Sequence, residues 1–99
     1  MIGYNLGYGI RRKVMAQNES MMIAKAGFDQ HAIETLHHHP HTQASYVSKG
    51  KFEILIGAEK LILKAGDIYF VSSGEEYGAV FLEQGELIDI FSPRRDDLL

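Results

Sequence analysis

The residues best suited to chemistry lie together near the middle of the chain. Four of the five histidines fall within five consecutive positions, and Gln43 follows shortly after them. If this segment is extended, its alternate residues project to one side: His37, His39, His41 and Gln43. Imidazoles spaced in this way can converge on one divalent ion at about 2.0–2.1 Å, and the Gln43 amide oxygen would be a neutral third donor. The segment therefore predicts a metal site, with His38, of opposite parity, at the surface.

A histidine-rich tract can also be a solvated loop, an adventitious metal scavenger or an expression tag. This tract is internal, it is interrupted by Pro40, and strand-like sequence flanks it on both sides. Those features argue against a tag, and we favour a specific metal site.

Length and composition predict one globular domain spanning residues 1–99. The chain is 45% hydrophobic with a formal net charge of -3, so it lacks the basic footprint of a nucleic-acid-binding protein. It has no cysteine, which excludes disulfides and thiolate metal sites. No apolar run approaches the roughly 20 residues of a membrane span, and no signal-peptide core is evident. We expect a cytoplasmic protein with no membrane partner.

The hydrophobic pattern is that of an all-β protein. Short apolar runs at Val14–Ala16 and Met21–Phe28 are separated by a polar cluster, and the chain from Ile33 to Gln43 resumes an extended path. Beyond it, turn-forming residues separate strand-like runs at intervals of about 8–12 residues, which predicts a sandwich or barrel. The one predicted helix is short and lies in the tail, Arg94–Leu99. Alternation predicts a shared face for Phe52, Ile54 and Ile56.

We divide the chain into an N-terminal arm (1–12), a barrel (13–91) and a C-terminal tail (92–99). A basic triplet, Arg11-Arg12-Lys13, spans the boundary between arm and barrel, and for it we favour a solvated strand start over a carboxylate-binding arginine. A small barrel has exposed sheet edges, and the arm could pair with a neighbouring subunit's sheet. We therefore expect a homodimer.

The last predicted strand carries an acidic residue on an apolar face. Leu87, Asp89 and Phe91 share one face of it, with isoleucines on the other. An acidic residue between two apolar neighbours is unusual in a plain core strand. The alternative to a functional role is a rim carboxylate paired with Arg94 or Arg95.

Two spaced motifs resemble those of the cupin superfamily. The first is His37-x-His39, three residues, Gln43, six residues and Gly50, with glutamine where many cupins have glutamate. The second is Gly66, five residues, Ser72-Ser73-Gly74, two residues and Tyr77, in which Ser72 replaces the usual proline and Tyr77 the usual histidine. The resemblance implies a small single-domain cupin, an antiparallel double-stranded β-helix or jelly-roll barrel.

The resemblance narrows to the KdgF type of small cupin. The residues that carry it are His-x-His-Pro-His-x-Gln followed by Tyr-Val-x-x-Gly, the leader 9–14 and the stretch 82–99. The family implies a divalent metal held by two histidines, a glutamine and a further histidine. It also implies an activity that opens the ring of 4,5-unsaturated monouronates, the small-molecule products of pectin and alginate breakdown, to the linear keto form.

Position by position, the resemblance assigns metal ligands to His37, His39 and Gln43, with Tyr77 in the fourth place. Either Tyr77 ligates, or His41 substitutes for the missing imidazole, or the site keeps three protein ligands and more water; we favour the third. A phenol has an ordinary pKa of about 10 and ligates well only as phenolate. Imidazole and amide ligands are compatible with zinc, nickel, iron, manganese or cobalt and do not distinguish among them.

The resemblance also assigns Asp89, Phe91 and Arg95 to the catalytic pocket beside the metal. For Phe91 alone core packing is the simpler interpretation, and Arg95 could equally be a solvated member of the charged run that follows Pro93. The hypothesis is a metal-dependent enzyme acting on unsaturated uronates. Its alternatives are a non-catalytic sugar-binding cupin with a degenerate metal site and another metal-dependent cupin enzyme, such as a dioxygenase or sugar isomerase.

Overall fold

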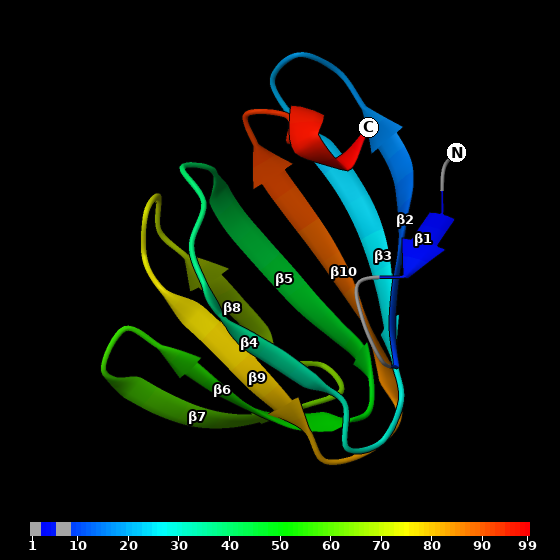
Figure 1. Cartoon of the computed structure of the whole chain (residues 1–99), viewed down its shortest axis with the longest axis vertical. Helices are drawn as coiled ribbons and strands as arrows, with labels where there is room; N and C mark the ends of the chain where they lie inside the picture. The colour runs from blue at the N-terminus through cyan, green and yellow to red at the C-terminus, as the bar shows by residue number, and fades with distance from the viewer. Residues whose placement is uncertain (1–2, 6–8) are drawn as a thin grey trace.

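The computed structural model describes residues 3–5 and 9–99, and within them the chain forms ten strands in two antiparallel sheets (Figure 1). The larger sheet has the order β1 (Gly3–Asn5), β2 (Ile10–Gln17), β3 (Met22–Phe28), β10 (Gly85–Ser92), β5 (Thr42–Lys49) and β8 (Ile68–Val71). The smaller sheet has the order β4 (Ile33–His37), β9 (Tyr77–Phe81), β6 (Lys51–Ile56) and β7 (Glu59–Lys64). The all-β prediction is confirmed, and no helix in the described residues is long and apolar enough to cross a membrane.

The two sheets face each other and enclose the core between them. Alternate residues point inward, as predicted: Phe52 and Ile54 of β6 are fully buried, and so are Asp89 and Phe91 of β10. A larger cluster fills the space between the sheets and includes stacked phenylalanines, Phe28 and Phe81 with ring centroids 3.8 Å apart. A smaller cluster lies against the tail and consists of Val14, Met22, Ala24, Phe91 and Leu98.

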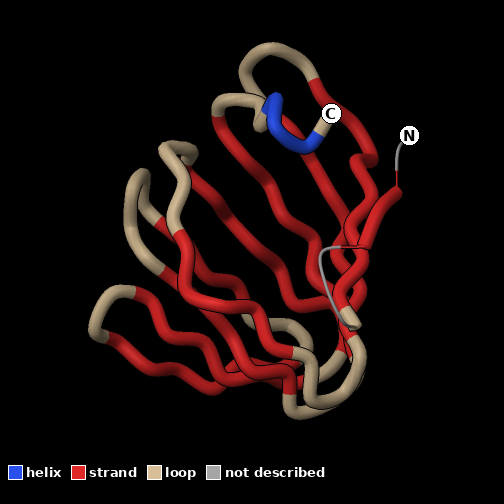
Figure 2. The backbone as a smooth tube through the Cα atoms, viewed as in Figure 1, coloured by secondary structure: helices blue, strands red, loops and turns tan. Residues whose placement is uncertain are grey.

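The tail follows β10 and closes the end of the molecule near the β2–β3 hairpin. Its helix is a single 3-10 turn, Asp96–Leu98, shorter than the predicted segment (Figure 2). Leu98 is buried in the smaller cluster and holds the turn there. At the other terminus, β1 pairs with β2 of the same chain, while residues 1–2 and 6–8 of the predicted arm lie outside the described residues. The homodimer stays a prediction.

The prediction that the histidine stretch follows one strand is wrong. The stretch crosses from one sheet to the other. β4 ends at His37 in the smaller sheet, the chain turns through 38–41, and Gln43 lies in β5 of the larger sheet. Pro40 has no amide hydrogen and cannot join a ladder, so the strand breaks there. Two hydrogen bonds fix the turn to the loop before β9: the Ser73 hydroxyl donates to the Pro40 carbonyl (2.5 Å) and the Gly74 amide to the His39 carbonyl (2.8 Å).

One arginine of the basic triplet is inside the protein. Arg11 and Lys13 are exposed, as predicted, but the alternation of β2 turns Arg12 inward, and only 6% of its surface is exposed. The prediction of a solvated strand start is therefore wrong for Arg12. Its Nη2 lies 3.8 Å from Oδ2 of Asp89, which is also buried, so the structure excludes the rim interpretation of Asp89.

The close approach of β4 to β9 depends on Gly78. A Cβ at this position would lie 2.8 Å from the Glu34 carbonyl oxygen and 3.1 Å from the Leu36 amide nitrogen. Backbone atoms cannot rotate away, so Gly78→Ala should lower the free energy of unfolding by about 2 kcal/mol in urea titrations. Gly27→Ala is the matched control, because its nearest new contact is 3.6 Å away. Equal midpoints for the two variants would contradict this packing.

The buried pair of Arg12 and Asp89 gives a second prediction. Arg12→Met keeps the length of the side chain but leaves a buried carboxylate without its cation, so it should cost about 3 kcal/mol of unfolding free energy. In Arg11→Met the lost pair with Asp29 is about half exposed, and the cost should stay below about 1 kcal/mol. Urea unfolding of both variants at neutral pH tests the difference. A small effect at both positions would show that Asp89 does not depend on Arg12.

Candidate functional site

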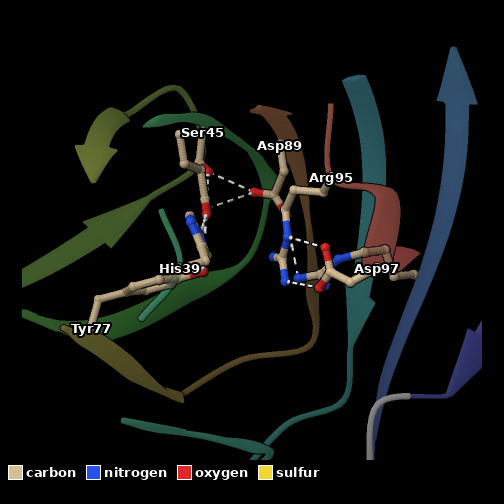
Figure 3. Close-up of polar contacts among 8 residues, drawn as sticks. His39, Ser45, Tyr77, Asp89, Arg95 and Asp97 are labelled. Atoms are coloured by element: carbon tan, nitrogen blue, oxygen red, sulfur yellow. Dashed lines mark hydrogen bonds and ion pairs between the residues drawn. The ribbon is translucent and has the colours of Figure 1, made fainter. Parts of the chain in front are cut away.

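Three buried side-chain atoms that could each bind a metal lie close together between the sheets. His39 Nε2 lies 3.0 Å from Gln43 Oε1 and 3.2 Å from the Tyr77 hydroxyl oxygen, and that hydroxyl donates to Gln43 Oε1 at 2.9 Å (Figure 3). Adjacent ligands of a six-coordinate ion with bonds of about 2.1 Å are separated by about 3.0 Å, so the triangle has the dimensions of a metal site. The turn, β5 and β9 each supply one corner. The structure thus brings together three of the four predicted ligands, although they do not share a strand.

The fourth predicted ligand, His37, lies beside Tyr77. The two residues are opposite each other in the β4–β9 register, with ring centroids 4.3 Å apart. His37 Nδ1 is 2.8 Å from the Thr35 carbonyl oxygen. A carbonyl only accepts, so Nδ1 carries the hydrogen, and in the neutral form of the ring the lone pair lies on Nε2. Metal-bound histidines are commonly held by a hydrogen bond of this kind from the other ring nitrogen.

The remaining histidines of the tract are placed differently. His38 is exposed, as predicted from its parity. His41 is partly buried, with its ring centroid 5.5 Å from that of His39, and its Nδ1 has no hydrogen-bond partner within the described part of the chain. Across residues 3–5 and 9–99, no three His, Asp or Glu side chains lie close enough to hold a metal together. A metal here would therefore need the amide of Gln43 or the phenol of Tyr77.

Burial determines the protonation of the Tyr77 hydroxyl and the His39 imidazole. It raises the pKa of Tyr77 well above that of an ordinary phenol, and the nearby carboxyls of Glu34 and Asp89 raise it further. Tyr77 is therefore a neutral hydrogen-bond donor. Burial also lowers the pKa of His39, which keeps the imidazole neutral, as a metal ligand must be.

A chain of hydrogen bonds leads from the triangle to Asp89. Gln43 Nε2 donates to Ser45 Oγ at 2.9 Å, and Ser45 Oγ donates to Asp89 Oδ1 at 2.6 Å. Ser45 and Asp89 are directly opposite in the β5–β10 register. Burial raises the pKa of Asp89, while Arg12 and the Ser45 hydrogen bond act against that rise. The predicted acid is thus two hydrogen bonds away from the predicted amide ligand.

Phe91 and Arg95 border the same site. Phe91 is fully buried in the smaller core cluster, and the His39 ring meets it edge-on with centroids 5.8 Å apart. The Arg95 guanidinium carbon lies 5.0 Å from the centre of the Phe91 ring, and Asp97 holds the guanidinium through contacts of 2.7 and 3.3 Å. Only 9% of Arg95 is exposed, so it is not a solvated member of the charged run.

The structure adds polar residues that the sequence did not reveal as site residues. Glu34 of β4 lines a small interior cavity together with Arg12, Gln43, Tyr69 and Asp89. The pKa of Glu34 is raised, mainly by burial. His37 acts against this rise, and Asp89 adds to it. Alternation from Gln43 would have found Ser45, two residues further along the same strand. Glu34 had no such signal. The apolar residues near it, Ile33 and Leu36, would be expected to point inward, yet both are exposed in the structure.

Comparison with known proteins agrees with this geometry. A model of the cupin domain matches residues 25–91. The pectin degradation protein KdgF of Dickeya dadantii (strain 3937) is 46% identical over 96 residues, covering 95% of this chain and 87% of that protein. KdgF from Halomonas sp. superposes with a TM-score of 0.92 at 39% identity, covering 100% of this chain and 92% of that one. An RmlC-like cupin from Shewanella frigidimarina NCIMB 400 gives 0.93 at 37% identity, covering 99% and 88%. The chain belongs to the cupin family and, within it, to the small cupins of the KdgF type.

Proposed function

We propose that this protein is a metal-dependent enzyme that opens the ring of 4,5-unsaturated monouronates released from pectin or alginate. The observation that carries the proposal is the buried triangle of His39, Gln43 and Tyr77, linked by two hydrogen bonds to the carboxyl of Asp89. Similarity to a pectin degradation protein over 95% of the chain supports the substrate class.

The donor set fits a divalent ion of the zinc, nickel, iron, manganese or cobalt type. The hydrogen bond of His37 Nδ1 leaves Nε2 of the neutral ring to bind a metal, and His39 Nε2 and Gln43 Oε1, 3.0 Å apart, have the spacing of adjacent ligands. His37, His39 and Gln43 would hold the metal. Tyr77 occupies the position of the family's fourth ligand, but its raised pKa keeps it neutral, so it would donate a hydrogen bond to Gln43 instead of binding the metal. When bound, the ion supplies Lewis acidity toward the substrate carboxylate and ring oxygen.

Ring opening is an isomerisation that moves one proton. The bond between the anomeric carbon and the ring oxygen breaks, the anomeric hydroxyl loses its proton as it becomes an aldehyde, and the double-bond carbon distal to the carboxylate gains one. Asp89 would carry that proton as general base and acid. Its Oδ1 accepts from the Ser45 hydroxyl, so Oδ2, which lies 3.8 Å from Arg12 Nη2, would exchange the proton.

Arg95 and Phe91 would bind and orient the substrate. Asp97 holds Nε and Nη2 of Arg95 and keeps the guanidinium against Phe91, which leaves Nη1 to contact the substrate carboxylate. Phe91 would form the apolar wall that keeps the sugar ring beside Asp89.

One observation favours a second candidate, a sugar-acid-binding cupin that does not catalyse. Tyr77 replaces the usual imidazole, and its raised pKa makes it a weak ligand. In that case the barrel would bind a uronate without converting it.

Elemental analysis of the untagged protein tests the metal. Inductively coupled plasma mass spectrometry should find close to one divalent ion per chain, and His37→Ala/His39→Ala should abolish it because two imidazole donors are lost. His38→Ala removes an exposed histidine of the same tract and should retain the ion. An absence of metal in wild type, even after reconstitution, would favour the binding module.

Asp89→Asn tests the chemistry. The amide cannot transfer the proton, so kcat/KM for unsaturated galacturonate should fall by about 10²–10⁴, followed as loss of absorbance of the conjugated double bond. Asp29→Asn is the control, since Asp29 is exposed and its side chain pairs with Arg11 at the surface, outside the site. Equal rates for wild type and Asp89→Asn would remove Asp89 from the reaction.

A further inference from the structure

A single serine lies between the amide of Gln43 and the carboxyl of Asp89. Ser45 is 1% exposed, and its Oγ is 2.9 Å from Gln43 Nε2 and 2.6 Å from Asp89 Oδ1. A hydroxyl has one hydrogen to donate and two lone pairs to accept with. An ionised carboxylate only accepts, so the hydrogen of Ser45 goes to Asp89 and a lone pair faces Gln43.

That direction fixes which end of the Gln43 amide faces which neighbour. With a lone pair of Ser45 directed at it, the nearer end must be the NH₂ group, which also lies 3.5 Å from Asp89 Oδ1. The carbonyl oxygen then faces His39 and Tyr77. It lies 3.0 Å from His39 Nε2 and accepts a hydrogen bond from the Tyr77 hydroxyl at 2.9 Å. A flipped amide would set its oxygen against Ser45 Oγ and Asp89 Oδ1, neither of which has a hydrogen left to donate to it. It would also present NH₂ to the triangle, where it could not bind a cation.

The sheet holds these three groups in line. Gln43 and Ser45 are two residues apart and therefore on the same face of β5, and Ser45 is directly opposite Asp89 of β10. We propose that Ser45 is the positioning residue that turns the oxygen of the Gln43 amide toward the metal. This inference rests on the proposed function, because it assigns a role at the same metal site.

The test measures metal affinity directly, with cobalt(II) alone as the probe. Apo protein is titrated with Co²⁺ and followed by calorimetry and by the visible spectrum of the bound ion. Ser45→Ala should weaken binding by about 10–100-fold, the usual cost of losing a group that orients a ligand. The control is Ser48→Ala on the same strand, whose hydroxyl also donates to a carboxylate, Glu86, at 2.7 Å but outside the site. Ser48→Ala should bind Co²⁺ as wild type does.

A second background separates orientation from packing. In Gln43→Glu both ends of the side chain are oxygens, so no orientation has to be selected. Adding Ser45→Ala to Gln43→Glu should therefore weaken Co²⁺ binding by less than about threefold, which would show that the effect of Ser45 depends on the Gln43 amide.

Each outcome decides the matter. Wild-type affinity in Ser45→Ala would overturn the role of Ser45 and leave the metal site standing. A loss of the same size in the Gln43→Glu background would assign Ser45 to packing and also overturn it. If the wild-type protein binds no Co²⁺, the proposed metal-dependent function fails, and the inference fails with it.

Discussion

The carboxyl of Asp89 is buried in the middle of the barrel, and the arrangement around it follows from the need to compensate its charge. An uncompensated carboxylate in an apolar interior is costly. The register of β5 against β10 brings Ser45 to one oxygen, and the alternation of β2 brings Arg12 toward the other. Ser45 in turn accepts from Gln43, which reaches His39 and Tyr77. Three strands and one turn are thereby tied to a single charge.

Much of this could be predicted because the information is local. Period-two alternation placed Asp89 and Phe91 on one inward face. Turn residues marked the ends of the strands; one of them is Gly50, which lies between β5 and β6 and has a φ of +89°. Motif spacing identified His39, Gln43 and Tyr77 as partners although they are up to 38 residues apart. These successes depend on patterns that repeat along one strand or within one family.

Other features depend on contacts between distant segments and had no local signal. In the sequence, Arg12 looks like part of an exposed basic triplet; only the order of β2, β3 and β10 in the larger sheet brings it near Asp89. Glu34 has exposed apolar neighbours, so its inward direction appears only when β4 pairs with β9. The histidines read as one extended strand, whereas the turn at Pro40 passes them from one sheet to the other.

Hydrogen bonds join the atoms of His39, Gln43 and Tyr77 that face one another, while the other ring nitrogen of His39, Nδ1, has no partner within the described residues. The fold therefore does not need an ion to neutralise these groups, unlike small domains that collapse when a chelator removes their metal. An arriving cation must instead compete with hydrogen bonds that already exist, and it gains in return a site assembled in advance. If the proposed metal site is correct, the chain would fold before it binds the ion, and the supply of metal, rather than the supply of folded chain, would set how much active protein forms.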